Sequence, residues 1–341
     1  MKVLCVGLMV CDIIAKPVEK KMLEKDHSKI RCIHIRNGGD AFNVACNLVS
    51  LGIENCLHSA VGRDTIGAVV LENARNAGVC TDQIVIEDRE TSASLVMIQK
   101  DGERHFLSQN GASQFLTGKK IPDDLLEESD ILYIGSACDL PGLDGENLHC
   151  LLERAKAHQM ITVMDVTGNP GREELVKLKD SLPLIDFFMP SNYEAQSLTG
   201  TESEEAAAKA LIALGVKTVV IKRGSKGSLM LTADNPESIE YFPAYKMDAV
   251  DSTGAGDAFV SGFLAAYCKK YPIGQCIEIA SLTGADCVRT LGASGNLKNI
   301  SYYEQMMTWR KIYEESDENG CYDGVTEYGN SNASRTAAKR G

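Results

Sequence analysis

The sequence predicts an α/β protein in which helices cover both faces of a mostly parallel sheet, with a small β-sheet beside it. Short apolar runs rich in Val and Ile recur along the chain, and amphipathic segments long enough for helices lie between them. Two further segments alternate polar and apolar side chains, as strands with one exposed face do. At 341 residues the chain has material for one large domain or two medium ones.

The apolar runs are typical of strands that are buried on both faces. Helices are expected where apolar side chains recur at helical spacing, as Phe42, Ala45 and Val49 do. Strands and helices that alternate in this way favour right-handed crossovers and a parallel sheet. The expected central strands are residues 3–7, 130–135, 161–166 and 218–222, and the expected helices are 41–51, 143–159, 203–214, 255–271 and 273–288.

The alternating segments occupy about residues 13–37 and 91–110. The second contains Asp101-Gly102, a dipeptide that favours a tight hairpin turn. We interpret both segments as strands of a small sheet that projects from the main domain. That domain is expected to span residues 1–315, and the polar segment 316–341 is expected to be a partly disordered tail.

Composition excludes several classes of function. The formal net charge of −12 argues against nucleic acid as a partner, because an acidic surface repels phosphate backbones. The twelve cysteines form no C-x-x-C pair, which gives a zinc site no local support and indicates a reducing compartment, the cytoplasm. The first apolar run is short and soon meets Asp12, so we interpret it as a strand rather than a secretion signal. No apolar run reaches the ~18 residues of a membrane span.

The strongest chemical signal lies at residues 251–259, Asp-Ser-Thr-Gly-Ala-Gly-Asp-Ala-Phe. Gly254 and Gly256 flank a small residue just before an apolar helix, so free backbone N–H groups there can bind an anion. Asp257 follows in the first turn, where a carboxylate can accept the proton of an alcohol. A bare GxGD string would favour the alternative, a capped turn without a catalytic role.

The whole segment resembles the C-terminal signature of the ribokinase-like (PfkB) family of carbohydrate kinases. The resemblance implies a three-layer α/β/α sandwich with a mostly parallel central sheet and a small β-sheet lid. It also implies transfer of the γ-phosphate of ATP, with Mg²⁺, to a hydroxyl of a small carbohydrate. Asp257 would be the general base, and the amides of Gly254, Ala255 and Gly256 would form the anion hole.

A second match supports a sugar site. Residues 38–43, Gly-Gly-Asp-Ala-Phe-Asn, resemble the N-terminal signature of the same family. Asp12 is expected at the end of the first strand, where open α/β sheets bind ligands; a solvated strand-end acid is the alternative. The expected substrate-binding residues are Asp12, Gly38, Gly39, Asp40, Asn43 and Asn110, the last of which could equally be a turn residue.

Two segments resemble the family's nucleotide and magnesium regions. Residues 190–200 are similar to an Asn-x-x-Glu segment, in which Glu194 matches the glutamate that contacts Mg²⁺ through water, while Ser191 stands at the asparagine position. Residues 218–227 read as strand, turn, strand and are similar to the nucleotide loop. There Lys222 or Arg223 either contacts phosphates or covers the surface. The expected nucleotide-binding residues are Ser191, Glu194, Lys222, Gly224 and Gly227.

The family also suggests a monovalent cation and a dimer. Asp251 and Thr253 match residues that hold potassium beside the anion hole, together with a loop at about 290–296. Lid strands expose an apolar face, which family members often bury by pairing into a homodimer.

The acceptor remains open at this point, with a neutral sugar favoured. A phosphorylated acceptor would need clustered lid cations, for which Arg36, Arg104 and His105 are candidates. A nucleoside would need an apolar slot for its base. A non-catalytic sugar sensor would not need Asp257. A nicotinamide-dependent dehydrogenase would need a GxGxxG motif directly after the first strand, where this chain has none.

Overall fold

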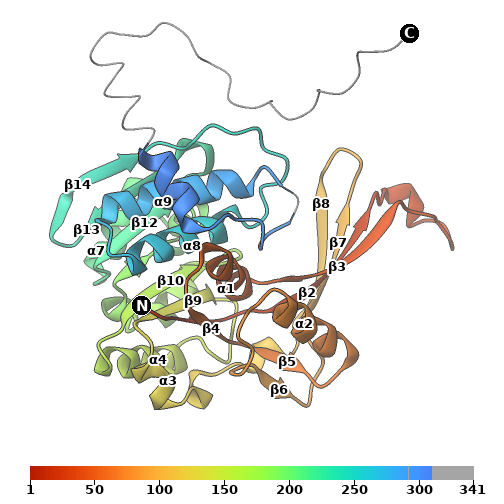
Figure 1. Cartoon of the computed structure of the whole chain (residues 1–341), viewed down its shortest axis with the longest axis horizontal. Helices are drawn as coiled ribbons and strands as arrows, with labels where there is room; N and C mark the ends of the chain where they lie inside the picture. The colour runs from red at the N-terminus through yellow and green to blue at the C-terminus, as the bar shows by residue number, and fades with distance from the viewer. Residues whose placement is uncertain (291, 309–341) are drawn as a thin grey trace, which may run out of the picture.

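The computed structural model describes residues 1–290 and 292–308, so the tail expected at 316–341 lies outside the described residues. Its main body is built around an eight-stranded sheet in the order β14-β13-β12-β11-β10-β9-β1-β4 (Figure 1). The strands from β12 to β4 are parallel, and β13 and β14 are antiparallel to their neighbours. These strands are β1 (Val3–Val6), β4 (Asn55–His58), β9 (Ile131–Ala137), β10 (Ile161–Val166), β11 (Phe187–Phe188), β12 (Thr218–Lys222), β13 (Ser228–Thr232) and β14 (Asn235–Phe242).

Helices cover both faces of this sheet, because its inner strands are apolar on both sides. In β1, Val3 and Cys5 contribute to one hydrophobic core, and Leu4 and Val6 to a second one. The first core includes α1 (Asp40–Leu51), α2 (Thr65–Asn76), α8 (Ala255–Cys268) and α9 (Ile273–Cys287). The second includes α3 (Asp123–Glu127), α4 (Glu146–Ala157), α5 (Arg172–Leu178), α6 (Asn192–Thr199) and α7 (Glu204–Ala213).

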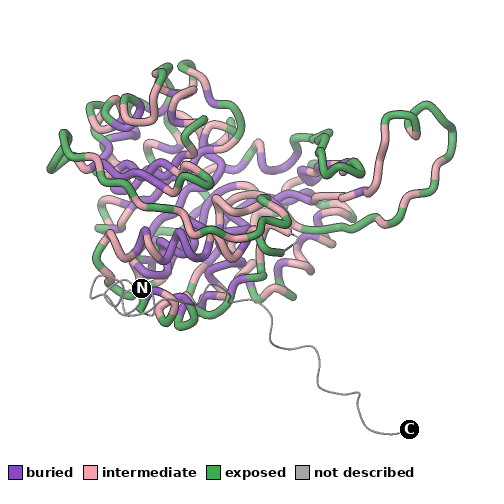
Figure 2. Tube along the Cα trace, turned by 90° about the horizontal axis from the view of Figure 1, so that it is seen from above, coloured by how far each residue is buried: buried purple, intermediate pink, exposed green. Residues whose placement is uncertain are grey.

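Buried residues accordingly run through the middle of the main body (Figure 2). The predicted α/β fold with a mostly parallel sheet is therefore confirmed. Within the described ranges, no helix combines the length and the apolar character that crossing a bilayer requires.

A second, four-stranded sheet projects from the main body and forms the lid (Figure 1). Its order is β3-β2-β7-β8, and the β7–β8 pair is the hairpin predicted at Asp101-Gly102. β1 ends at Val6, so Asp12 does not end the first strand as predicted but lies within β2. The lid strands are β2 (Val10–Lys16), β3 (Cys32–Gly38), β7 (Ala93–Ile98) and β8 (Arg104–Gln109); a two-stranded sheet of β5 (Ala60–Gly62) and β6 (Val85–Glu87) lies beside α2.

Candidate active site

The loop that leads into α8 lies between two clefts. A cleft of about 550 Å³ beneath the lid is lined by Asp12, Asp251 and Thr253, among others. A second cleft of about 480 Å³ is lined by Lys222 and Gly256, among others, and most of its remaining lining is apolar. Residues of one short loop thus contribute to both clefts, so ligands in the two clefts would meet at the start of α8.

The N-terminus of α8 is left open for a ligand. Gly254 precedes the helix with φ of 76°, and a Cβ there would lie 2.2 Å from the carbonyl oxygen of Ala293, so only glycine fits. No side chain caps this helix. Within the described residues, the backbone N–H groups of Gly256 and Asp257 have no hydrogen-bond acceptor. The first turn therefore presents free donors and the positive end of the helix dipole.

Asp257 lies in that first turn, and its carboxyl group is held by Asn43 of α1. Asn43 Nδ2 donates a hydrogen bond of 2.7 Å to Asp257 Oδ2. Burial, and next the neighbouring charge of Asp40, raise the pKa of Asp257 well above its usual range. No Lys or Arg among the described residues forms an ion pair with this carboxyl group. Its raised proton affinity suits a group that accepts a proton from an alcohol.

Lys222 of β12 brings a positive charge to the same place. Its Nζ lies 3.4 Å from the position that a Cβ on Gly256 would take, beside the free amides. It forms a buried ion pair with Asp165 at the end of β10. Although burial opposes the charge, Asp165 and then Glu194 raise the pKa of Lys222, so the ammonium group stays charged.

Asp165 was not identified from the sequence. It is 2% exposed, and burial raises its pKa to about 7 despite the charge of Lys222. Its position in the sequence could have indicated it, because it lies near the carboxyl end of a predicted parallel strand. Open α/β sheets bind their ligands at the carboxyl ends of their strands.

Two hydrogen-bond acceptors, one in the lid cleft and one beside Asp257, have no partner among the described residues. Burial raises the pKa of Asp12 to about 6, and no hydrogen bond or ion pair to its carboxyl group is present there. A Cβ on Gly38 would lie 2.2 Å from Asp12 Oδ2, so the glycine leaves the space that this carboxyl group occupies. Asn43 Oδ1 is buried and also lacks a partner. Buried acceptors of this kind suit the hydroxyl groups of a ligand.

The other expected substrate residues divide into two groups. Gly39 precedes α1 and Asp40 is the first residue of that helix, which places both near Asp257. Burial raises the pKa of Asp40. Asn110 is exposed after β8, does not line either cleft and, unlike Asn43, forms no hydrogen bond with Asp257, so the structure does not bring it to the site.

The expected nucleotide residues lie on the other side of the loop. Gly224 and Gly227 line the second cleft together with Lys222. Ser191 and Glu194 form the N-terminal cap of α6, in which Glu194 Oε2 accepts a hydrogen bond of 2.7 Å from the Ser191 N–H. The charge of Glu194 acts on Lys222 and Asp165, and neither Ser191 nor Glu194 lines the second cleft itself.

Arg104 of lid strand β8 reaches across the cleft to the loop before α8. Its guanidinium donates to Asp251 Oδ1 and to Thr253 Oγ1. Although burial opposes it, hydrogen bonds from Thr253 and Arg104 lower the pKa of Asp251 to about 2. The Gly292 N–H donates to the other oxygen, Oδ2, at 3.3 Å. This contact fixes the lid against the loop.

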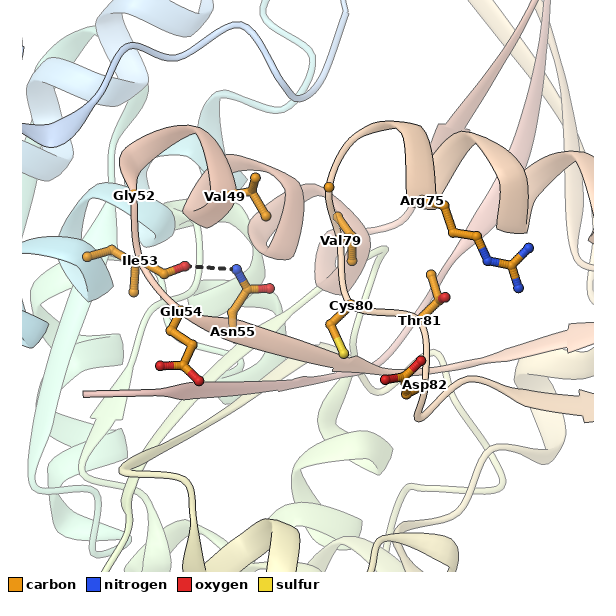
Figure 3. Close-up of a pocket in the computed structure, with 11 residues that line it drawn as sticks. Val49, Gly52, Ile53, Glu54, Asn55, Arg75, Val79, Cys80, Thr81 and Asp82 are labelled. Carbon is orange, nitrogen blue, oxygen red and sulfur yellow. Dashed lines mark hydrogen bonds between the residues drawn. The ribbon is translucent and has the colours of Figure 1, made fainter.

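A larger hollow of about 740 Å³ lies elsewhere and contains none of the expected site residues (Figure 3). It is formed by the loops that follow α1 and α2, and a hydrogen bond of 3.1 Å from Asn55 Nδ2 to the Ile53 carbonyl closes the turn at its edge (Figure 3). In the part of the chain that the structure describes, no three His, Cys, Asp or Glu side chains are grouped as a metal site would require.

Comparisons with known proteins identify the family of the chain. Residues 1–300 match the model of the pfkB family carbohydrate kinases. The chain is 25% identical over 283 residues to an ATP-dependent 6-phosphofructokinase of Thermoanaerobacterium thermosaccharolyticum, which covers 81% of this chain and 86% of that protein. It is 24% identical over 280 residues to a ribokinase of Staphylococcus aureus, covering 79% and 87%.

The fold is also that of solved relatives. The Arabidopsis thaliana ribokinase complexed with ribose and ATP superposes with a TM-score of 0.75 at 22% identity, covering 90% of this chain and 98% of the other. The fold is therefore ribokinase-like. Because the family match spans most of the sequence, the chain belongs to the pfkB family of carbohydrate kinases, enzymes that phosphorylate alcohol groups.

Proposed function

We propose that this kinase transfers the γ-phosphate of ATP to a hydroxyl of a small carbohydrate at the start of α8. The observation that carries the proposal is the position of one loop, residues 251–256, between the cleft under the lid, which contains charged side chains, and a largely apolar second cleft. Each cleft suits one substrate, and the free helix N-terminus lies where they meet.

The cleft under the lid binds the acceptor. Asp12 and Asn43 Oδ1, the two acceptors without protein partners, receive hydrogen bonds from sugar hydroxyls. Asp257 accepts the proton of the attacking hydroxyl, and Asn43 Nδ2 orients its carboxylate. The hydroxyl oxygen forms a bond to the γ-phosphorus while the bond from that phosphorus to the bridging oxygen of ADP breaks.

The second cleft binds ATP. Met247, Phe259 and Val288 line it and provide an apolar surface for the adenine ring. The γ-phosphate lies against the free amides of Gly256 and Asp257, with the Lys222 ammonium beside it; the Ala255 N–H, which the sequence placed in the anion hole, donates to the Ser252 carbonyl instead. Fixed donors and a buried cation stabilise the charge that develops on the transferred group without reorganisation.

The Glu194 carboxylate suits contact with a magnesium ion through water, beside the phosphates of ATP. Glu194 uses one oxygen for its cap and keeps the other available, and Asp165 lies nearby. When bound, Mg²⁺ supplies neutralisation of phosphate charge, with Glu194 as a ligand through water. The Asp251 site does not fit potassium in this arrangement, because N–H donors and a guanidinium already surround the carboxylate. No step of the proposed reaction involves a monovalent cation.

The outer face of the lid supports a homodimer. The register of the four strands aligns Ile35, Ile13, Leu95 and Leu107 in one row across the sheet, in which Ile13 also packs against the first core and Ile35 also borders the lid cleft. Ile35 is 50% exposed and Leu107 54% exposed. A contiguous apolar row on a sheet suits burial against a second copy of the same surface.

An ADP-release assay with Mg²⁺-ATP tests the proposed reaction over hexoses, pentoses, sugar acids, sugar phosphates and nucleosides. We expect acceptor-dependent ADP release with one class of carbohydrate and a phosphate ester as product by mass spectrometry. The absence of acceptor-dependent turnover across the whole panel would contradict the proposal. The names of the two curated relatives leave the choice between neutral and phosphorylated sugars open.

A further inference from the structure

The cleft under the lid contains basic side chains that a neutral sugar would not use. Lys16, His34 and Arg36 all line it. Within the described residues, none of these three side chains has an ion-pair or hydrogen-bond partner. The other lid cation, Arg104, is already occupied by Asp251.

Strand register places these cations on the same face of the lid as Asp12. β2 and β3 pair Asp12 with Arg36 and Ile14 with His34. Directly paired residues of neighbouring strands project to the same side, and residues two apart along one strand do so as well. Lys16 therefore continues the row that Asp12 and Ile14 begin.

The positions along the lid strands give the distances from Asp12 to the basic side chains. Asp12 lies beside Gly38, which leads directly to α1 and Asn43, so it marks the end of the cleft nearest to Asp257. Two residues along a strand cover about 7 Å, which places His34 roughly that far from the Asp12 and Arg36 pair. Lys16 lies about 13 Å from Asp12.

An apolar floor runs beside this row of charges. The register aligns Ile14 with Val96 of β7, and Val96 with Phe106 of β8. All three line the cleft. A carbon skeleton can therefore extend from Asp12 along this floor toward the cations, with its hydrophobic face against the strands.

The charge balance of the cleft favours an anion. Its carboxylates are Asp12 and Asp251, and Arg104 neutralises the second of these. Lys16 and Arg36 therefore exceed the remaining acid by one charge, in a protein whose formal net charge is −12. Unpaired cations that gather in one cleft of an acidic protein produce a local positive potential that attracts negative ligands.

We propose that the acceptor carries an anionic group, a carboxylate or a phosphate, that lies against Arg36 and Lys16 of the lid. Arg36 binds this group through its planar fork of donors, with His34 and Lys16 beside it. His105 has no part in this, because it projects from β8 on the side opposite to Arg104. The inference rests on the kinase function proposed above and replaces the neutral sugar that the sequence favoured.

Steady-state kinetics with matched acceptors test this proposal. Each aldonic acid and each sugar phosphate in the panel is compared with its neutral parent sugar, so that the carboxylate and phosphate sources are separated. The variants are Arg36→Gln, Arg36→Lys and, as a control, Arg31→Gln, an exposed arginine that does not line the cleft. A hydrogen bond between charged groups contributes more binding free energy than one between neutral groups. We therefore expect Arg36→Gln to raise the KM of the anionic acceptor about 10- to 100-fold.

The KM for Mg²⁺-ATP should not change in Arg36→Gln, and Arg36→Lys should recover part of the loss, since it keeps the charge without the fork. Arg31→Gln should behave as the wild type. Neutral sugars used as well as their anionic counterparts, or a KM unaffected by Arg36→Gln, would overturn the inference.

Direct binding separates a failure of this inference from a failure of the kinase proposal. Isothermal titration calorimetry of the full chain, with the same acids, phosphates and neutral sugars, needs no turnover. Binding of an anionic compound that weakens in Arg36→Gln supports the inference even if no ADP is released. Binding of neutral sugars alone refutes it while leaving the kinase function intact, and ligand binding without any turnover refutes the kinase function.

Discussion

Asn43 and Asp257, 214 positions apart in the chain, are joined by a hydrogen bond of 2.7 Å. The bond connects the first turn of α1, which follows lid strand β3, to the first turn of α8, which follows the proposed anion hole. The two segments that resemble the family signatures are therefore joined through this pair of side chains.

We expect Asp257→Asn to lower kcat by about 10²- to 10⁴-fold, because the amide cannot accept a proton. ATP binding should persist. The melting temperature should equal or exceed that of the wild type, since the substitution removes a buried carboxyl group that Asp40 crowds. Steady-state kinetics and thermal unfolding provide the measurements, with the exposed Asp234→Asn as control. A near-normal kcat in Asp257→Asn would refute its role as base.

The pH dependence of kcat/KM should reveal the environment of Asp257. Its ionised form is the active base, so activity should rise with pH through its pKa, which burial and Asp40 place above the usual value for Asp. In Asp40→Asn the neighbouring negative charge is absent, the pKa of Asp257 falls, and the acid limb should move to lower pH. A limb that stays in place in this variant would show that Asp257 does not control it.

Lys222→Met should lower both the stability of the fold and the turnover of the enzyme. It leaves Asp165 buried without a counter-ion, which costs about 3–5 kcal/mol of unfolding free energy. Loss of one fixed donor at the transferred phosphate should also lower kcat by about 10²- to 10³-fold. The double variant Asp165→Asn with Lys222→Met should recover stability but not activity.

Denaturant unfolding and kinetics measure the two effects of Lys222→Met. Lys209→Met is the matched control, because its ion pair with Glu237 is solvent-exposed and contributes less than about 1 kcal/mol. If the double variant also regained activity, Lys222 would have only a structural role.

Potassium should have little effect on the wild type, since Arg104 already supplies a positive charge to Asp251. Arg104→Gln removes the guanidinium from that carboxylate. Turnover of this variant should then be higher in KCl than in tetramethylammonium chloride of the same ionic strength. The ADP-release assay measures both proteins in parallel. Strong potassium activation of the wild type would show that the guanidinium does not occupy this position during turnover.

Leu107→Glu should disrupt the dimer proposed for the outer lid face, because it places charge in the apolar row. Size-exclusion chromatography with light scattering should give about twice the chain mass of 36.9 kDa for the wild type and a single chain mass for the variant. Val176→Glu, an exposed apolar residue on α5, is the control. A wild type that elutes as a monomer would refute the dimer.

The regular elements of the main body could be predicted because their signals are local. The expected strand 161–166 and the expected helix 273–288 coincide with β10 and α9 to within one residue. β11 was not predicted, because a two-residue strand has no periodicity of its own and exists through its pairing with β10 and β12. α2 was missed as well, since its mixed surface buries only Gly67, Val70 and Ala74.

The site was predicted less completely. Asp257 and the glycines before α8 follow from a contiguous string, but Asp165 becomes recognisable only when β10 and β12 bring it to Lys222. Asp12 was placed one strand too early, because the apolar run continues from β1 into β2 without a break in composition. Asn110 was expected at the site on the evidence of its position in the chain alone, and it lies on the surface.

The strand order has a consequence for biosynthesis. β1 lies between β4 and β9, so one of its edges stays unpaired until residue 137 of 341 has left the ribosome. Such an edge is a template for aggregation, and nascent chains that end before β9 should depend on chaperones. α8 emerges much later, so the nucleotide cleft is completed only after the rest of the central sheet has had time to form.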